Sequence, residues 1–443
     1  MTSATLQPSV SQFANRRQKL MQSLGGGAII LTAGHDAPRN NDVDYEFRQQ
    51  STFWYLTGFD EPDAVAVLRP GHPDPYVLFV RPYDPKFEIW VGYRAGVAGA
   101  MKLHGADAAF SIDELTEELP KLLEDVEVVQ YGLGSDRKMD QIIADLVNRR
   151  RNGAQRAGNP LLSIHDPKPV IDQMRLFKSV DEIESLQRAI AVTAQGFDAA
   201  MRHSKVGGYE YQVQAEMESA FRRQGSPRNG YPSIVASGGN SCTLHYVTNR
   251  AQVQDGDLLL IDAGAEVDYY TADITRTWPV NGRFSPEQRA VYDVVLEAQH
   301  RAFEVIAPGA RFEDVHLAAL RVLVQGLVEL GALHGDVDGL IEQRAHQPYY
   351  MHGTSHWLGL DVHDAGQYRV NDESIALQEG MVFTVEPGLY FGPLATESPA
   401  VLKGIGIRIE DNVLVTGGGY QNLSAEIPSQ PDQIEALVGT ATG

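Results

Sequence analysis

The sequence predicts an α/β protein of the mixed α+β kind, with an N-terminal α/β domain and a second domain built from two related halves. Its 443 residues exceed the usual size of one domain, and hydrophobic residues at 43% can fill more than one core. Apolar strand-like runs alternate with amphipathic helical patterns in both parts of the chain. A pattern of paired helices also occurs twice in the second part.

Charge and cysteine content narrow the class of protein. A formal net charge of -21 argues against nucleic acid and anionic membranes as partners, and most of the acidity is expected on a solvated surface. The single cysteine, Cys242, cannot form an intramolecular disulfide, and we interpret it as a small buried hydrophobe. No run approaches the ~18 apolar residues of a membrane helix, and the first residues lack the apolar core of a signal peptide. We therefore expect a cytoplasmic protein.

The first domain is expected over residues 1–170. Its mixture of strand and helix patterns can form a core of its own. The polar stretch 149–169 contains glycine and proline, and it indicates the domain boundary. The predicted elements are helices at 11–24, 112–123 and 138–149 and strands at Ala28–Thr32, 53–56, 64–68, Tyr76–Val80 and 89–91.

The second domain is expected over residues 171–443. A capping box at Ser179 precedes an apolar repeat of helical spacing, and Ser285 begins the same pattern again. The same number of residues separates Ser179 from Ser285 and Gly225 from Gly331. We therefore predict two related halves, whose cleft is a natural place for a site. The predicted helix pairs are 179–201 with 211–223, and 285–306 with 313–330.

The stretch 257–280, DLLLIDAGAEVDYYTADITRTWPV, predicts a β-hairpin that carries two acids. If the chain turns at Val267 and Asp268, Asp262 and Asp273 lie directly opposite each other, with Cβ atoms ~5 Å apart. Two carboxylates at that distance among apolar residues repel each other and lose hydration, and a divalent cation removes this penalty. The hairpin is therefore interpreted as half of a metal site.

Three later residues occupy similar apolar, glycine-rich contexts. His356 lies in MHGTSHWLGL, Glu386 follows the strand-like run 381–385, and Glu410 follows GIGIRI. With Asp262 and Asp273 they supply four carboxylates and one imidazole, too much negative charge for one divalent ion but nearly balanced by two. Mostly oxygen ligands with one nitrogen favour Mn(II), with Zn(II), Co(II) or Fe(II) as alternatives.

Each of these residues also has a structural explanation when taken alone. Asp273 could pair with Arg276, Glu410 could pair with Arg408, and His356 could be a satisfied interior histidine. Three of the acids at the ends of apolar strands are harder to explain in this way.

The spacing of His352 and His356 would suit a zinc-binding helix. Gly353 and Gly359 interrupt that pattern, and no glutamate follows His352, so the HExxH motif is absent. Both histidines are therefore placed on a loop or strand.

Four strings resemble the metal-binding signatures of the M24 metallopeptidases: LLLIDAGAEVDYYTADITRTWPVNG, MHGTSHWLGLDVHD, GMVFTVEPGLY and GIGIRIEDNVLVT. The resemblance implies the pita-bread fold, with pseudo-twofold halves, for residues 171–443. Three further strings, QQSTFWYLTGFDEPDAV, FEIWVGYR and MRLFKSVDEIE, resemble the bacterial aminopeptidase P branch of that family. Removal of an N-terminal residue that precedes proline is the implied reaction.

Carried over to this sequence, the resemblance implies a dinuclear site and the residues around it. The implied metal ligands are Asp262, Asp273, His356, Glu386 and Glu410. The residues implied to line the substrate site are His245, His352, His363 and Arg408, and Tyr231 matches a position beside the ligands.

The implied chemistry gives these residues distinct roles. Glu386 is expected to shuttle a proton from the attacking water to the proline nitrogen. His363 is our first choice, and His245 our second, for the hydrogen bond that stabilises the oxyanion, while His352 positions the substrate beyond the scissile bond. The alternative for the three histidines is that they orient the metal ligands.

Selection for proline requires a shaped apolar wall, because the ring fixes φ and removes a backbone donor. Trp90 and the region of Tyr231 are candidates, although core packing is the preferred role for Trp90 and Trp54. In relatives the N-terminal domain of one subunit often borders another's active site. The resemblance therefore implies a homo-oligomer, a dimer or tetramer, whose N-terminal domain serves oligomerisation and substrate access.

The expected function is that of an Xaa-Pro aminopeptidase acting on peptides of varied length. The nearest alternative is a prolidase, which cleaves only dipeptides. A metal-free binding protein on the same fold is a second alternative, and the presence of all five ligands argues against it. A creatinase-like hydrolase would not be expected to keep this ligand set.

Overall fold

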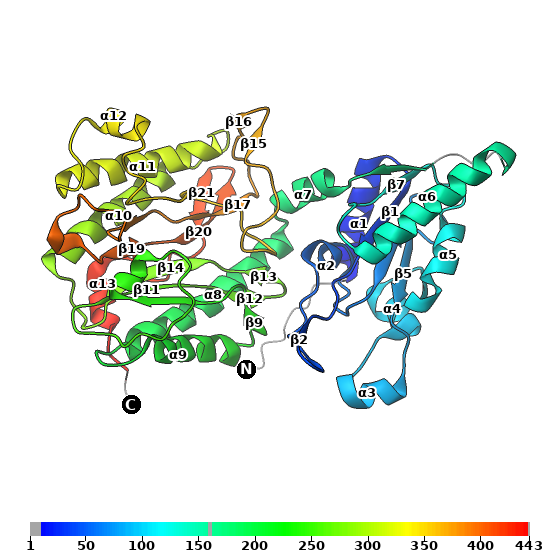
Figure 1. Cartoon of the computed structure of the whole chain (residues 1–443), viewed down its shortest axis with the longest axis horizontal. Helices are drawn as coiled ribbons and strands as arrows, with labels where there is room; N and C mark the ends of the chain where they lie inside the picture. The colour runs from blue at the N-terminus through cyan, green and yellow to red at the C-terminus, as the bar shows by residue number, and fades with distance from the viewer. Residues whose placement is uncertain (1–9, 158–161, 442–443) are drawn as a thin grey trace. The chain divides into compact units, whose positions relative to one another are not determined.

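The computed structural model describes residues 10–157 and 162–441, and the chain divides into two compact units, Met1–Gln173 and Met174–Gly443 (Figure 1). The sequence placed the boundary between residues 170 and 171. The polar stretch 149–169, which the sequence indicated as the boundary, contains regular structure and belongs to unit 1. Its first part continues α6 (Arg137–Ala157), and its last part contains β8 (Ser163–His165), which pairs with β7 (Val128–Gln130).

Unit 1 is built on a six-stranded sheet in the order β6-β5-β4-β1-β7-β8. Strand β4 pairs antiparallel with both of its neighbours, and the other pairings are parallel. Leu119 of α5 and Ile143 of α6 pack in one cluster with Val77 and Val129 of the sheet. The other bounds are α1 Val10–Leu24, β1 Ala28–Thr32, β4 Val65–Leu68, β5 Tyr76–Val80, β6 Ala108–Ser111 and α5 Leu115–Leu122.

Two predicted strands of unit 1 are helices instead, and the prediction was wrong for both. Residues 53–56 lie in α2 (Ser51–Thr57), where the Gln50 side chain accepts a hydrogen bond from Phe53 N at 2.6 Å and Gly58 ends the helix at φ 63°. Most of this short helix is buried, so its sequence shows no amphipathic period that would separate a helix from a strand. Trp54, 5% exposed, packs in the core as expected.

Residues 89–91 lie in α3 (Pro85–Val91), which begins with a signal that the strand interpretation overlooked. The Asp84 side chain accepts a hydrogen bond from Lys86 N at 2.8 Å, and Pro85 occupies the first turn. Trp90 is 85% exposed on this helix, so the expected core role for it is wrong.

Unit 2 contains two helix pairs, with the strands between them (Figure 1). The capping boxes predicted at Ser179 and Ser285 are both confirmed. Ser179 N donates to the Glu182 carboxylate at 2.9 Å, and Ser285 N donates to the Gln288 side chain at 3.0 Å. The pairs are α8 (Val180–His203) with α9 (Glu210–Arg223), and α10 (Pro286–Glu304) with α11 (Phe312–Glu329).

The strands of unit 2 form several small sheets over one core. Strand β11 pairs with β10 and β14, and β20 pairs with β17 and β21. The two halves meet at a backbone bridge between Thr275 and Glu410. Beside it, the Arg276 side chain donates hydrogen bonds to the carbonyls of Glu410 and Ile427. The same guanidinium forms an ion pair with Asp411 at 2.7 Å. The bounds are β10 Ile234–Ser237, β11 Leu258–Ala263, β14 Ile274–Pro279, β17 Val382–Val385, β18 Gly388–Tyr390, β19 Gly406–Arg408, β20 Asp411–Thr416 and β21 Gly419–Asn422.

The hairpin forms, but its predicted register is wrong. Asp262 pairs with Thr275 rather than Asp273, because the turn residues are Asp268 and Tyr269, at φ 49° and 68°. A two-residue turn with both residues in the left-handed region fits the strand twist, whereas a β-branched Val267 disfavours that conformation and stays in β12 (Ala265–Val267). The shift is two residues, so Asp262 and Asp273 still share a face as diagonal neighbours.

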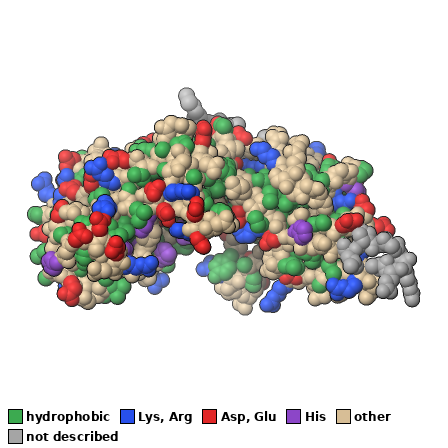
Figure 2. Space-filling view, turned by 90° about the horizontal axis from the view of Figure 1, so that it is seen from above, with side chains coloured by type: hydrophobic (Ala, Val, Ile, Leu, Met, Phe, Trp, Pro, Cys, Tyr) green, Lys and Arg blue, Asp and Glu red, His purple; other side chains and the backbone are tan. Residues whose placement is uncertain are grey.

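The surface and the helices fit the composition. Figure 2 shows acidic side chains spread between basic ones over the visible face. In residues 10–157 and 162–441, no helix combines the length and apolarity needed to cross a membrane. Cys242 is half-buried against the core of unit 2, and burial raises the pKa of its thiol to about 11, so it is a weak nucleophile at neutral pH.

Candidate metal centre

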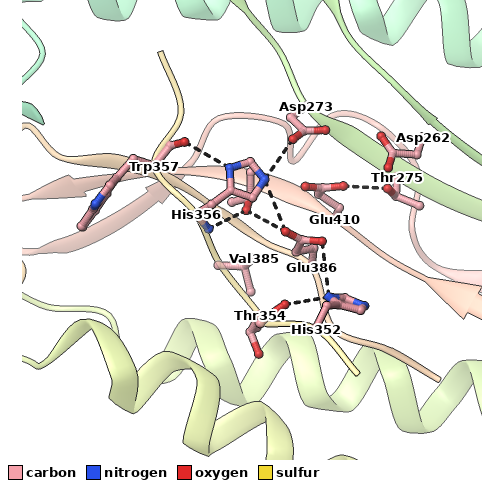
Figure 3. A network of polar contacts seen from close by, with 12 residues as sticks. Asp262, Asp273, Thr275, His352, Thr354, His356, Trp357, Val385, Glu386 and Glu410 are labelled. Atoms are coloured by element: carbon pink, nitrogen blue, oxygen red, sulfur yellow. Dashed lines mark hydrogen bonds and ion pairs between the residues drawn. The ribbon is translucent and has the colours of Figure 1, made fainter. Parts of the chain in front are cut away.

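The five residues expected to bind metal come from five separate segments of unit 2 and lie close together (Figure 3). Asp262 lies on β11, and Asp273 immediately precedes β14. His356 lies in the loop before Trp357, which bridges to Phe383 of β17. Glu386 follows β17, and Glu410 lies between β19 and β20.

Short distances link the members of this cluster. His356 Nε2 lies 3.2 Å from an Asp273 carboxylate oxygen and 3.4 Å from Glu386 Oε1. Ligand atoms of Asp273, His356 and Glu410 all lie within 4.8 Å of one another. The Tyr231 hydroxyl lies 2.6 Å from Asp262 Oδ1 and 2.5 Å from Asp273 Oδ1, so it joins the two hairpin acids.

Burial and mutual repulsion oppose ionisation of the clustered acids. Burial raises the pKa of Glu386 to about 7, and burial together with Asp273 holds the pKa of Glu410 well above its ordinary value. Burial would lower the pKa of His356, but Asp273 and Glu386 outweigh it and raise that pKa to about 9. The protein alone therefore holds these carboxylates at a cost that a bound cation would remove.

One oxygen of Glu410 shows that the residues fit a metal. Its Oε2 accepts a hydrogen bond from Thr275 Oγ1 at 2.6 Å. Its Oε1 is buried and has no hydrogen-bond partner within the described residues. Since buried carboxylate oxygens normally have a donor, an unpaired one aimed into a cluster of acids and an imidazole is typical of a metal ligand. Four carboxylates and one imidazole form an oxygen-rich donor set that suits divalent ions such as Mn(II).

The structural alternatives for Asp273 and Glu410 do not form among the described residues. Arg276 pairs with Asp411 rather than with Asp273. Arg408 pairs with Asp262, its Nη2 lying 2.6 Å from Asp262 Oδ2, rather than with Glu410. The carboxylates of Asp273 and Glu410 are thus left facing the cluster.

The four residues expected to line the substrate site lie around the cluster. His352 Nδ1 is 3.7 Å from Glu386 Oε2, and burial, with Arg408, lowers the pKa of His352 to about 3. The ring of His363 meets the ring of His356 edge-on, with centroids 4.3 Å apart. His245 and His363 are both exposed, and partial burial lowers the pKa of His363.

Tyr390 is a site residue that the sequence reasoning missed. Its hydroxyl lies 2.8 Å from His352 Nε2 and accepts a hydrogen bond from Arg408 at 3.1 Å. It thus connects two residues that were singled out separately. The signal was present, because Tyr390 closes the string GMVFTVEPGLY, but only the acid of that string was interpreted.

Glu386 gives a pH-dependent prediction for the metal-free protein. An acid whose folded pKa is raised destabilises the fold when it ionises, so this loss is absent near pH 4.5 and complete above about pH 7. After chelation, Glu386→Gln is expected to be more stable than the wild type by ~1–3 kcal/mol at pH 8. At pH 5 the difference should be about a quarter of its size at pH 8, because only the first part of the interval between the two pKa values has been crossed.

Urea unfolding in EDTA at both pH values measures this difference. Glu342→Gln, at an exposed position of unit 2, serves as the control and should show the same small effect at both pH values. A Glu386→Gln effect that is independent of pH would contradict the proposed burial of charge.

Comparison with known proteins agrees with this geometry. The family model for metallopeptidase family M24 matches residues 184–417, and that for the aminopeptidase P N-terminal domain matches residues 13–130. The chain is 43% identical over 436 residues to Xaa-Pro aminopeptidase of Escherichia coli (strain K12), covering 98% of each chain.

Solved structures show the same similarity over nearly all of the chain. Pseudomonas aeruginosa aminopeptidase PepP superposes with a TM-score of 0.95 at 45% identity, covering 98% of both chains. A variant of Escherichia coli aminopeptidase P in complex with substrate superposes with a TM-score of 0.93 at 43% identity, covering 97% of this chain and 98% of that one.

Proposed function

The chain belongs to metallopeptidase family M24 and is a metallo-aminopeptidase, and we propose that it releases the N-terminal residue from peptides with proline in second position. The observation that carries this proposal is the convergence of five ligand-type side chains around the unpaired oxygen of Glu410, in a chain similar from end to end to Xaa-Pro aminopeptidases. Hydrolysis of the Xaa-Pro bond is the function that this arrangement supports best.

We assign the metal site to the clustered acids and the imidazole. When bound, two divalent ions supply the nucleophile by lowering the pKa of water to about 7, and they polarise the scissile carbonyl. Mn(II) is our choice on the donor set, with Zn(II), Co(II) and Fe(II) as alternatives. The assigned ligands are Asp262, Asp273, His356, Glu386 and Glu410.

Glu386 is assigned the proton transfer. Its pKa of about 7 in the metal-free protein shows how strongly the site resists a further negative charge, so its carboxylate can accept a proton from water. It can then release that proton to the proline nitrogen, which must become an amine to leave. His352, held by Tyr390 at 2.8 Å, lies beside Glu386 and remains neutral at pH 7 because its pKa is about 3.

His363 and His245 are assigned to the developing oxyanion. Both are exposed, so a substrate can reach their ring nitrogens, and His363 lies against the ligand His356. A neutral imidazole can donate one hydrogen bond to a carbonyl oxygen as it becomes negative. His363 remains our first choice because its contact with His356 places it next to the ligand cluster.

Arg408 is assigned a supporting role in the same site. Its guanidinium donates to Asp262 Oδ2 at 2.6 Å and to the Tyr390 hydroxyl at 3.1 Å. It thereby fixes a ligand and, through Tyr390, the ring of His352. Its positive charge also offsets part of the carboxylate charge.

We propose a homo-oligomer, dimer or tetramer, whose N-terminal domain serves oligomerisation and substrate access. The 85% exposure of Trp90 leaves that side chain available for the apolar wall that proline requires. We propose the cytoplasm as the compartment, with which a single cysteine is compatible.

A rate panel of Xaa-Pro peptides from two to five residues, run with metal analysis, tests the function. We expect cleavage at every length, and at least ~10-fold slower cleavage when alanine replaces the second-position proline. Cleavage of the dipeptide alone would identify a prolidase instead. Purified protein that contains no divalent metal and cleaves nothing would support a binding protein on the same fold.

A further inference from the structure

A buried cluster of charges underlies the loop that carries His363. Asp361 and Asp364 lie on either side of His363 in the string DVHD. Arg175 Nη2 lies 2.7 Å from Asp361 Oδ2 and 2.5 Å from Asp364 Oδ1, and Lys178 Nζ lies 3.0 Å from Asp364 Oδ2. The side chains of Arg175, Lys178 and Asp364 are 5%, 1% and 2% exposed.

Stability alone is a weak reason for such a cluster. Removing charges from water costs several kcal/mol per ion, and well-packed apolar residues often stabilise a fold as well as a buried ion pair does. Burial would raise the pKa of Asp364, but Lys178 and Arg175 outweigh it and hold that pKa below its ordinary value. A planar guanidinium that bridges two carboxylates fixes their relative position, which is a geometric role.

Backbone hydrogen bonds join the loop to itself and to the segment that carries the ligand His356. Asp364 N donates to Trp357 O at 2.9 Å, and Trp357 follows the ligand His356 directly. Gly359 N donates to Asp361 O at 3.2 Å, and a Cβ on Gly359 would lie 2.2 Å from Asp364 Oδ2. The Asp364 carboxylate therefore has almost no room to move.

His363 depends on this loop for its place. Within the described residues no hydrogen bond to its side chain is found, and its exposed ring contacts only the edge of the His356 ring among aromatic groups. Lys178, by contrast, is anchored, because its own N–H donates to Gly380 O at 2.8 Å and it directly precedes the capping box of α8. Lys178 and Arg175 are therefore held in place by their own contacts. In the described part of the chain, His363 is held only through the loop whose two aspartates pair with these cations.

We infer that Arg175 and Lys178 are positioning residues for the reaction. Their ion pairs with Asp361 and Asp364 fix the loop and so keep His363 beside the ligand His356. This inference rests on the proposed function, because His363 matters only if it meets the substrate there. Misplacing a group that acts in the transition state lowers kcat more than it raises KM. Release of the loop should therefore mimic the loss of His363 itself.

A double-mutant cycle on an Xaa-Pro tripeptide tests the inference. Arg175→Met is expected to lower kcat by ~10–100-fold, with KM changed by less than about threefold and bound metal unchanged. In a His363→Ala background, the same substitution should lower kcat by less than about twofold, because the side chain that Arg175 holds is gone. Equal losses in both backgrounds would overturn the inference.

Matched control variants distinguish loss of positioning from misfolding. Arg321→Met removes a cation from an exposed pair with Asp338 in the same unit and should leave kcat unchanged. Arg175→Lys keeps one cationic contact and should recover part of the loss. If Arg175→Met does not fold, Asp361→Asn replaces it in the cycle, because that side chain is 43% exposed and its removal leaves the buried pairs intact.

The proposed function and the positioning role can be overturned separately. A wild-type protein that carries metal but cleaves no Xaa-Pro peptide overturns the proposed function. A wild-type protein that cleaves them, combined with additive losses in the cycle, overturns only the positioning role.

Discussion

Replacing Glu410 by alanine is expected to lower kcat/KM on an Xaa-Pro peptide by at least ~1,000-fold, equivalent to ~4 kcal/mol of transition-state stabilisation. The reason is that Glu410 Oε1 is a buried oxygen with no hydrogen-bond donor in the part of the chain that the structure describes, so its place is explained by a cation. Asp262→Ala should have a comparable effect, because Asp262 belongs to the same cluster and pairs across the hairpin with Thr275, which donates to Glu410. Bound metal, measured by elemental analysis, should fall in both variants.

Both variants should still fold, because each removes one of several carboxylates that repel one another. Burial and neighbouring acids raise the pKa of both Glu410 and Asp262, so neither ionised group stabilises the metal-free protein by itself. Near-ultraviolet circular dichroism checks the fold, and Glu342→Ala at an exposed position serves as the control. Turnover at the wild-type rate in either variant would remove that residue from the site.

Chelation is expected to abolish activity in the wild type, and added Mn(II) to restore it. Without cations the site lacks both the water of lowered pKa and the charge that polarises the carbonyl. The chelated protein should also unfold at a lower temperature, since a ligand at 100 times its Kd adds about 2.7 kcal/mol to the stability of the folded state. Activity and the melting temperature are measured on the same sample.

Reconstitution with one metal at a time distinguishes manganese from the alternative ions. Mn(II), Zn(II), Co(II) and Fe(II) are added singly to chelated protein, with Mg(II) as a hard-cation control. Recovery with Zn(II) but not with Mn(II) would overturn the choice of manganese. Activity that survives exhaustive chelation would contradict a metal-dependent reaction altogether.

The sequence predicted most of the second unit because its signals are local. The capping boxes at Ser179 and Ser285 involve residues three positions apart, and both are present in the structure. Each acid of the site lies in or beside an apolar strand run, so their approximate positions could be inferred. The short apolar run 53–56 was mistaken for a strand because a helix that is mostly buried shows no amphipathic period.

The finer geometry depends on features that local patterns do not encode. The register of the hairpin follows from left-handed conformations at Asp268 and Tyr269, and tyrosine is an unusual residue there. Tyr390 joins His352 to Arg408 through contacts between distant parts of the chain. Such contacts form only when distant segments pack together. The ion pairs of Arg175 with Asp361 and Asp364, which fix the His363 loop, also depend on that packing.

The guanidinium of Arg276 ties the halves into one folding unit. It belongs to the first half, yet its acceptors at Glu410, Asp411, Ile427 and Pro428 all belong to the second. In a fragment that ended after the first half, this cation would keep, of its acceptors among the described residues, only the carbonyl of Thr275 and would lose its carboxylate partner Asp411. The repeat in the sequence therefore does not correspond to two autonomous pieces, and a chain cut between them would have to reassemble by fragment complementation before either piece became stable.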